Sequence, residues 1–246
     1  MLHQASSDFG NYRVVEMTYS DRPARLLFGD DKSPQSGIAL DNDPELLFDY
    51  NQRFMEIAFS IQPKRILVIG GGAFSLPVAL ASRLQDAVID VVEIDPLLPE
   101  LARQYFNLKD QPINVFVDDG RKFLEKNNTK YDLIIVDAFS GLDIPRSLLS
   151  VAAIKLYNAA LLPAGLVTIN LISAFHTPKP QLAHQLIETF KTAFNQIKIY
   201  PADHYANLAV SDNLILTASH KPLDLPYLQA VSLTNKKPLS ADIIYD

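Results

Sequence analysis

The sequence lacks cysteine, a surplus of positive charge and any long uninterrupted apolar run. None of its 246 residues is cysteine, which excludes disulfides, thiolate catalysis and cysteine-ligated metal sites and fits the reducing environment of the cytoplasm. A formal net charge of -6 provides no basic surface for nucleic acid or an anionic membrane. The same charge would tolerate a cationic substrate.

Signals for membrane insertion and export are also missing. The longest apolar stretch, residues 159–175, is interrupted by Pro163, Gly165, Thr168 and Asn170. It therefore predicts a helix end, a turn and a buried strand rather than a membrane span. The first 13 residues are polar from the start and contain no apolar core of signal-peptide length. We therefore expect a cytoplasmic protein with no membrane partner.

Two familiar kinds of catalytic motif are absent. The five histidines have no spacing that suits metal ligands, and no metal-binding motif occurs, so we predict no metal. No G-x-S-x-G sequence is present, which argues against a serine nucleophile on a strand-to-helix elbow.

Apolar residues make up 48% of the chain, enough for a sizeable core, and they begin as short strand-like runs. Residues 1–42 are predicted to form a small antiparallel β unit, because β-favouring runs alternate there with turn clusters. A helix is expected next, with Asp43 as its N-cap and Pro44 at its first position. The strand-like runs are Tyr12–Thr18, Ala24–Phe28 and Gly37–Leu40.

Residues 43–246 are predicted to form a methyltransferase-type Rossmann domain, so the expected fold class is α/β. From Arg65 onward, β-branched runs alternate with amphipathic stretches, which is typical of a mostly parallel sheet with helices on both faces. Closely spaced runs later in the chain predict an antiparallel edge, and residues 222–246 are expected to be irregular. The runs are Ile66–Ile69, Val88–Glu93, Ile113–Val117, Leu133–Val136 and Leu166–Leu171, then Ile197–Tyr200, Leu208–Val210 and Leu214–Thr217.

A glycine turn follows the first strand of this domain. Gly70, Gly71 and Gly72 stand between a predicted strand and a predicted helix, where the backbone can approach a ligand at a helix N-terminus. As a dinucleotide fingerprint the match is incomplete, because Ser75 occupies the place of the third glycine.

Acidic residues follow the next three strands. Glu93 lies about twenty residues beyond the glycines, where a carboxylate can accept both ribose hydroxyls, and Asp95 is predicted to cap the next helix. Asp119 could accept from an adenine amino group, cap its own helix, or do both, and Asp137 adds a further carboxylate. An adenosyl-sulfonium ligand, positively charged at sulfur, suits these acids better than a nicotinamide dinucleotide does.

Several short motifs share their order and spacing with a known family. They are Gln35-Ser36-Gly37, Tyr50, Ile69-Gly70-Gly71-Gly72, Val92-Glu93-Ile94-Asp95, Tyr105-Phe106, Asp119-Gly120-Arg121 and Tyr131-Asp132-Leu133-Ile134-Ile135-Val136-Asp137. From about Tyr12 to Ser219 the chain resembles the spermidine synthase family. The resemblance implies a β-rich N-terminal domain over a Rossmann domain, assembly into homodimers or tetramers, and aminopropyl transfer from decarboxylated S-adenosylmethionine to a diamine.

The resemblance also implies roles for individual residues. Glu93 would hold the ribose and Asp119 the adenine. Asp137 would be the general base that takes a proton from the attacking ammonium, with Tyr50 as a hydrogen-bonding partner. This suits the chemistry, because an amine displaces the thioether only in its free form. The nucleoside-binding residues implied in this way are Gln35, Gly70, Gly71, Gly72, Glu93, Asp119 and Gly120.

Two positions in the predicted substrate pocket depart from the family's pattern. Ala73 stands where the family has the aspartate that anchors the donor's ammonium, and Ser140 stands where it has a second acid. Each missing carboxylate removes a charge-assisted hydrogen bond of about 1.5–3 kcal/mol, so amine binding should weaken. The acids that could supply replacement charge are Asp143, Asp41 and Asp203.

Three functions stay open. The first is an aminopropyltransferase-like enzyme that acts on a polyamine-type acceptor through a depleted acidic pocket. An acid at position 73 would repel the carboxylate of ordinary S-adenosylmethionine, so Ala73 also permits a methyltransferase that uses this donor. The third is a non-catalytic protein that binds nucleotide thioethers.

Overall fold

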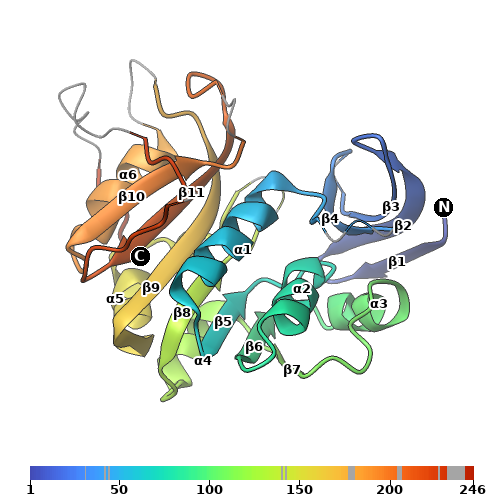
Figure 1. Cartoon of the computed structure of the whole chain (residues 1–246), viewed down its shortest axis with the longest axis horizontal. Helices are drawn as coiled ribbons and strands as arrows, with labels where there is room; N and C mark the ends of the chain where they lie inside the picture. Colours follow the sequence, from blue (N-terminus) through green and yellow to red (C-terminus); the bar gives the residue numbers. More distant parts are fainter. Residues whose placement is uncertain are drawn as a thin grey trace.

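The chain folds around two β-sheets of different size and strand direction (Figure 1). The computed structural model describes residues 1–30, 32–41, 43, 45–139, 141, 143–176, 181–203, 207–226, 228–231 and 242–246. Ser140, one of the two predicted departures in the substrate pocket, lies outside these residues.

The N-terminal sheet is antiparallel, in the order β1-β2-β3-β4. Its second hairpin turns at Ser20 and Asp21, which both have a positive φ. Tyr19 pairs with Arg22 across this turn, as a tight two-residue hairpin requires. The runs predicted in this region form the last three strands, whereas the polar first strand was not predicted. The strands are β1 His3–Ser7, β2 Gly10–Tyr19, β3 Arg22–Phe28 and β4 Pro34–Ala39.

The larger sheet has seven strands in the order β10-β11-β9-β8-β5-β6-β7. Its five strands from β5 to β9 run parallel, and β11 pairs antiparallel with both β9 and β10. The predicted α/β fold, a mostly parallel sheet with an antiparallel edge behind a small antiparallel sheet, is thereby confirmed. The strands are β5 Arg65–Ile69, β6 Val88–Glu93, β7 Ile113–Val117, β8 Tyr131–Val136, β9 Leu161–Ser173, β10 Gln196–Pro201 and β11 Asp212–Ser219.

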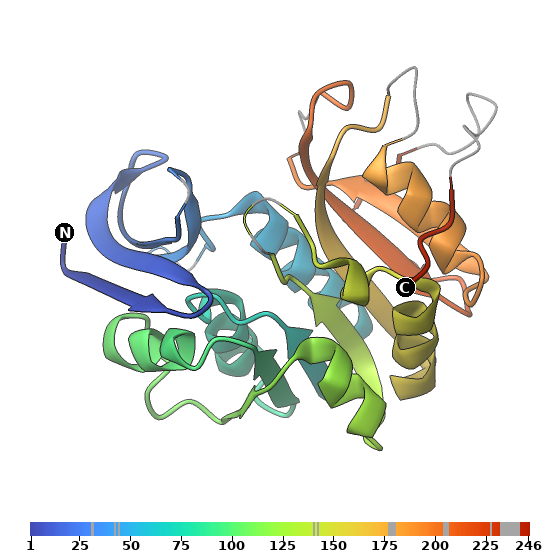
Figure 2. The same ribbon diagram turned by 180° about the vertical axis from the view of Figure 1, so that it is seen from behind.

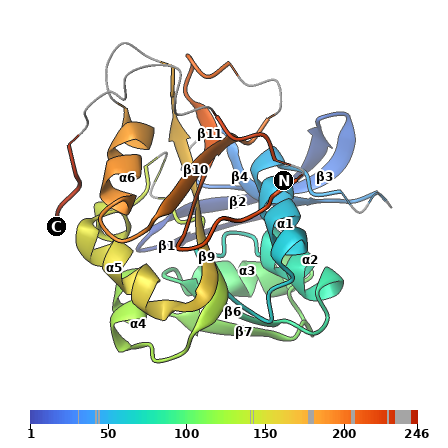
Figure 3. The ribbon, with the colours of Figure 1, turned by 60° about the vertical axis from the view of Figure 1, so that its left-hand side comes forward.

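Helices cover both faces of the large sheet (Figures 2 and 3). On one face, α1, α2 and α3 bury Phe54, Leu80 and Leu101 in a core that continues into the N-terminal sheet. On the other face, α4, α5 and α6 contribute to a second core. The helices are α1 Asp49–Ile61, α2 Ser75–Arg83, α3 Leu97–Tyr105, α4 Gly120–Lys126, α5 Val151–Ala160 and α6 Leu182–Phe190, with a short 3-10 helix η1 at Arg146–Leu148.

The predicted start of the first helix is wrong. The helix α1 begins at Asp49 rather than after Asp43, and Pro44 lies outside the described residues. The Arg22 guanidinium donates to the carbonyl oxygens of Asp43 and Glu45 and thereby holds this segment against the N-terminal sheet, outside the helix. The Asp43 carboxylate accepts from the Glu45 N–H at 2.9 Å, which is a local turn instead of a helix cap.

The predicted strand Leu208–Val210 is also wrong, because these residues form a turn before β11. The Asn207 side chain accepts from the Ala209 N–H at 3.1 Å, and the Asn207 carbonyl accepts from the Val210 N–H at 2.9 Å. Asparagine favours this kind of local turn over the strand preference of the valine. Within the described part of residues 222–246 there is no helix or strand, as predicted.

Polar contacts attach the N-terminal sheet to the Rossmann sheet. The Ser7 hydroxyl donates to Asp95 at 2.5 Å, and the Arg25 guanidinium donates to the Tyr105 carbonyl at 2.7 Å. Asp95 also accepts from the Leu97 N–H at the start of α3, so it has the capping role predicted for it. Among the described residues, no helix is both long and apolar enough to cross a bilayer.

Candidate functional site

The site lies where the direction of strand succession reverses, between β5 and its neighbours β6 and β8. Open parallel sheets bind ligands at the carboxyl ends of such strands. Gly70 leaves β5 with a φ of +92°, and a Cβ there would lie 2.3 Å from the Asp137 carbonyl oxygen. Only glycine fits both this backbone conformation and this contact. The glycine turn and Asp137 are therefore in direct contact, as the sequence predicted for one shared crevice.

Glu93 lies against the glycine turn. Its Oε2 accepts from the N–H groups of Gly71 and Gly72 at 2.7 and 3.3 Å, and its Oε1 accepts from the Asp95 N–H at 3.0 Å. The side chain is 5% exposed. Burial raises its pKa, and the three backbone N–H groups oppose that shift. The predicted ribose-binding acid thus also holds the turn in shape.

The first turn of α2 closes one side of a small cavity. Phe74 precedes this helix in the left-handed region, with a φ of 60°, and such backbone strain in a bulky residue is often found at functional sites. The hydroxyls of Ser36 and Ser75 lie 3.0 Å apart across the join between β4 and α2. The cavity is lined by Ser36, Asn51, Val68, Gly70, Gly71, Ser75, Leu76, Pro77 and Asp137.

Ala73 is 1% exposed and belongs to the core shared by α1, α2 and the N-terminal sheet. The place where the resemblance implies a cation-binding acid therefore holds a buried methyl group. Asp143 is exposed, and Asp41 makes an ion pair with Arg22 at 2.6 Å. The Arg22 contact keeps the pKa of Asp41 below its usual range, so the charge of Asp41 is already paired.

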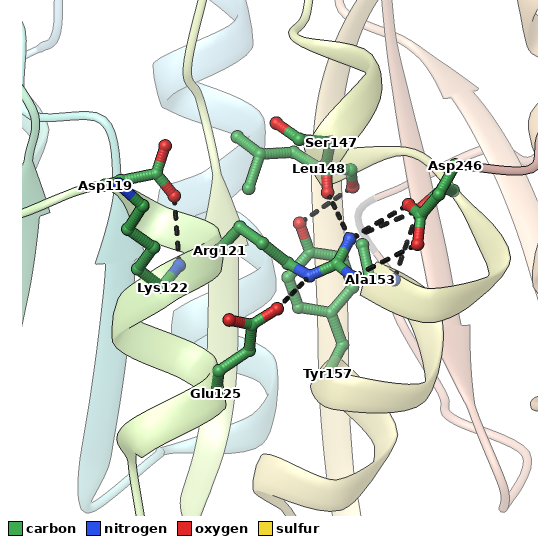
Figure 4. A network of polar contacts seen from close by, with 10 residues as sticks. Asp119, Arg121, Lys122, Glu125, Ser147, Leu148, Ala153, Tyr157 and Asp246 are labelled. Atoms are coloured by element: carbon green, nitrogen blue, oxygen red, sulfur yellow. Dashed lines mark hydrogen bonds and ion pairs between the residues drawn. The ribbon is translucent and has the colours of Figure 1, made fainter.

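Asp119 caps α4, with its Oδ1 accepting from the Lys122 N–H at 3.0 Å (Figure 4). Gly120 follows it, and a Cβ there would lie 2.5 Å from the Ile69 side chain. Glycine thus lets α4 pack closely on β5, which brings Asp119 next to the carboxyl end of that strand. The capping role predicted for Asp119 is confirmed, and adenine binding stays a prediction.

Arg121 ties α4 to the C-terminal residues, a contact that the sequence did not suggest. Its guanidinium donates to Glu125, to the Ser147 carbonyl and to both carboxylate oxygens of Asp246 (Figure 4). Asp246 also accepts from the Ser150 hydroxyl at the start of α5. The helix that carries Asp119 is thereby fixed to η1, to α5 and to residues 242–246.

Asp137 follows β8 and is half-buried. Its Oδ1 accepts from Nδ2 of Asn170, on β9, at 3.0 Å. Burial raises the pKa of Asp137 to about 6, and the Asn170 N–H opposes the rise. A carboxyl group with a pKa this close to neutral can both accept and release a proton at physiological pH, which suits a general base.

Tyr50 lies on α1 beside Asp137. Its hydroxyl donates to the Gln35 carbonyl at 3.1 Å, whereas Asp137 takes its hydrogen bond from Asn170. Burial raises the pKa of Tyr50 well above its usual value, with a further contribution from the negative charge of Asp137. The Gln35 side chain itself is exposed. The structure therefore brings Gln35, Tyr50 and Asp137 together, but the phenol bonds to backbone rather than to the carboxylate.

Tyr50 also lines a second cavity, of about 550 Å³. Four acids line it from three parts of the chain: Glu45, Asp49, Asp203 and Asp212. Burial raises the pKa of Asp49, and the charges of Asp203 and Asp212 raise it further. Of the four acids, only Asp203 was singled out in the sequence. The combined negative charge of the cavity suits a cation.

Within the described ranges, no group of three or more histidine, aspartate or glutamate side chains is placed to hold a metal ion. Neither of the buried amides, Asn51 and Asn170, was predicted from the sequence as a site residue. Asn170 could have been found as a single amide in the apolar strand between Ile169 and Leu171.

Comparison with known proteins agrees with this geometry. The model of the spermine/spermidine synthase domain matches residues 48–213, which is more than half of the chain. The chain belongs to the spermidine synthase family. This confirms the resemblance seen in the motifs.

Relatives within and near the spermidine synthase family fall into two groups. Polyamine aminopropyltransferases of Vibrio vulnificus and Agathobacter rectalis are 32% and 30% identical, each over 53% of this chain. A Drosophila melanogaster protein named eEF1A lysine and N-terminal methyltransferase homolog is 31% identical over 55% of this chain and 23% of its own length. The chain spans about half the length of the two aminopropyltransferases, 46% and 53% respectively.

Solved structures show the same fold. A probable spermidine synthase from Corynebacterium glutamicum has a TM-score of 0.79 at 21% identity, covering 91% of this chain and 82% of its own. A spermidine synthase in complex with the transition state analogue AdoDATO has a TM-score of 0.69 at 16% identity, covering 98% and 81%. Human methyltransferase-like protein 13 in complex with SAH has a TM-score of 0.58 at 21% identity, covering 70% and 82%.

Proposed function

We propose that this protein transfers an aminopropyl group from decarboxylated S-adenosylmethionine to a cationic amine, with Asp137 as the base. The observation that carries the proposal is a half-buried carboxyl group with a pKa of about 6. Its own backbone contacts the glycine turn, and its neighbour Tyr50 lines a cavity rich in acids. The aminopropyltransferases among its relatives and the structure in complex with AdoDATO support the same reaction.

The donor would occupy the glycine side of the site. Glu93 would accept the ribose hydroxyls in addition to the N–H groups of the turn, since each carboxylate oxygen has two lone pairs. Asp119 would meet the adenine with the oxygen that does not cap α4. The buried Ala73 offers the aminopropyl ammonium no counter-charge, so binding of this donor would depend mainly on its nucleoside part.

The acceptor would reach Asp137 from the acidic cavity. An ammonium gives a proton to Asp137, and the freed lone pair attacks the methylene carbon beside the sulfonium. The new C–N bond forms as the C–S bond breaks, and the sulfur keeps the bonding electrons, so neutral methylthioadenosine leaves. Glu45, Asp49 and Asp212 line the cavity beside Tyr50 and would attract further positive charge on the acceptor.

Methyl transfer is the second candidate, and Ala73 favours it. Without an acid at that position, the site does not repel the carboxylate of S-adenosylmethionine. The Drosophila relative and human methyltransferase-like protein 13 carry methyltransferase names. A non-catalytic protein that binds nucleotide thioethers is the third candidate.

One competitive calorimetric series on the purified protein separates these candidates. Methylthioadenosine, S-adenosylhomocysteine and decarboxylated S-adenosylmethionine are the probes. Preference for methylthioadenosine and the decarboxylated donor supports aminopropyl transfer, whereas preference for S-adenosylhomocysteine supports a methyltransferase. If none of the three binds, the adenosyl site itself is refuted.

Three further proposals come from the sequence and the family. We propose that the N-terminal unit ends at residue 42, that the protein acts in the cytoplasm, and that it assembles into homodimers or tetramers. Limited proteolysis near residue 42 and analytical ultracentrifugation test the first and the last of these.

A further inference from the structure

Two buried amide side chains beside Asp137 each leave a carbonyl oxygen without a hydrogen-bond donor. Asn51 and Asn170 are both 2% exposed, and the Oδ1 atom of each has no partner. A buried acceptor without a donor destabilises a folded protein, so such atoms in a native structure call for a reason. A ligand that brings N–H groups would supply the missing donors.

The orientation of the Asn170 amide follows from its contact with Asp137. Its Nδ2 donates to Oδ1 of Asp137 at 3.0 Å. The flipped amide would place its oxygen against the carboxylate oxygen, where two acceptors repel each other. The Asn170 oxygen is therefore directed away from Oδ1 of Asp137, while the second oxygen of Asp137 remains available to a substrate.

Core packing gives no reason for an amide at this position of β9. Leu166 belongs to the core beneath α1, and Thr168 and Asn170 follow at a spacing of two, so they share its face of the sheet. Both are buried. An apolar residue would fill this face without leaving a carbonyl oxygen unpaired.

We propose that Asn170 positions both reactants: its N–H group fixes Oδ1 of Asp137, and its carbonyl oxygen accepts an N–H of the attacking amine. This inference rests on the proposed function. The ammonium then gives one proton to Oδ2 of Asp137 while Asn170 holds a second N–H of the same nitrogen. The lone pair that is released is thereby aimed at the donor carbon, where the C–N bond forms and the C–S bond breaks.

In the part of the chain that the structure describes, Ser36, Asn51 and Ser75 line the same cavity as Asp137. Tyr50 approaches from α1 and Asn170 from β9. The pKa of Asp137 reflects burial, which raises it to about 6, and the Asn170 N–H, which opposes that rise. Without this N–H, the pKa of Asp137 should rise by a further one to two units, as expected for a lost hydrogen bond to a charged group.

The test compares wild-type protein with Asn170→Leu, Asn170→Asp and the control Thr168→Val. Thr168 lies two residues before Asn170 on the same buried face, and its hydroxyl also has no partner, so its substitution reports general disturbance of the strand. One measurement is the ¹³C NMR titration of the Asp137 carboxyl, identified by difference from Asp137→Asn. The other is calorimetric binding of 1,4-diaminobutane to the protein saturated with methylthioadenosine.

Asn170→Leu should raise the pKa of Asp137 above about 7 and weaken diamine binding by about tenfold or more, while Thr168→Val should match the wild type. Asn170→Asp returns an acceptor oxygen without the N–H group, so diamine binding should recover while Asp137 still titrates high. Unchanged titration in Asn170→Leu, or unchanged diamine affinity, would overturn the proposal. If the wild type binds methylthioadenosine but no amine, the proposed function fails, whereas the carboxyl titration still decides whether Asn170 holds Asp137.

Discussion

The two halves of the candidate site differ in how their polar groups are satisfied. On the adenosyl side, Glu93 accepts three backbone N–H groups and Asp119 caps α4. On the amine side, the carbonyl oxygens of Asn51 and Asn170 have no donor, and burial raises the pKa of Asp137. Both oxygens of Glu93 thus have donors without a ligand, whereas the two amide oxygens have none.

This difference suggests which residues select the nucleoside and which select the amine in the proposed reaction. Backbone N–H groups around Glu93 fix the shape of the proposed nucleoside site at little cost to stability, because both carboxylate oxygens already have donors. The unpaired amide oxygens destabilise the folded protein. Under the proposed function, an amine that brings N–H donors would gain binding energy that an apolar group of the same size would not. A substitution of Glu93 should therefore weaken nucleoside binding, whereas a substitution of Asp137 should increase the stability of the folded protein.

The largest expected effect is the loss of transfer in Asp137→Asn. A missing general base lowers the rate by about 10²–10⁴-fold. Affinity for methylthioadenosine should stay unchanged, because the proposed nucleoside contacts lie on the adenosyl side. Steady-state kinetics and calorimetry measure the two quantities, with Asp86→Asn, at an exposed residue, as the control. Full activity in Asp137→Asn would rule out Asp137 as the base.

The same substitution should also make the protein more stable near neutral pH. The pKa of Asp137 is raised from 3.8 to about 6 in the folded protein, so the unfolded chain loses this proton first as the pH rises. Stability therefore falls between these two values, by an amount on the order of 3 kcal/mol, and remains lower above them. Asp137→Asn should remove this part of the pH dependence. Urea unfolding at about pH 4 and pH 7 tests this, and parallel profiles for the two proteins would contradict it.

A smaller effect is expected on the adenosyl side, from Glu93→Gln. The variant keeps the shape of the side chain but loses the charge that accepts the N–H groups of the turn. Affinity for methylthioadenosine should fall by about 10–100-fold, and stability should fall as well, opposite to Asp137→Asn. Glu125→Gln, at a partly exposed residue of α4, is the matched control. Equal affinity in the two variants would show that the side chain of Glu93 does not bind the nucleoside.

The smallest effect should come from the acidic cavity. Replacing Asp49 and Asp212 with asparagine should weaken binding of 1,4-diaminobutane by about fivefold, the size expected for partly exposed charges. The loss should shrink as salt is added. In the wild type, the raised pKa of Asp49 predicts that amine affinity increases as the pH rises and Asp49 loses its proton. An affinity that is independent of salt and pH would place the amine elsewhere.

The sequence predicted the Rossmann sheet well, because its strands are apolar runs closed by glycine or acid. Glu93 and Asp137 were predicted as site residues for that reason, each at the end of such a run. The start of α1 was predicted wrongly, because Arg22 binds carbonyl oxygens about twenty residues away in the chain, and no local pattern reports such a contact.

The acidic cavity was largely missed for a related reason. Its acids lie just before and at the start of α1, just after β10 and at the start of β11, so most of the chain separates them. Asn51 and Asn170 become notable only when the structure shows that their oxygens are buried and unpaired. Hydrophobic periodicity places a residue on a face of the sheet, but it does not say which of its atoms lack a partner.

The contact between Gly70 and the Asp137 carbonyl has a consequence for how this site could diverge. Any side chain at position 70 would push on the segment that carries the base, so one substitution would alter nucleoside affinity and turnover together. We expect substitutions at position 73, whose side chain lies in the core beside the turn, to act on packing there and not through the Asp137 carbonyl. New donor specificity is therefore more accessible through position 73 than through the glycine that joins the two halves.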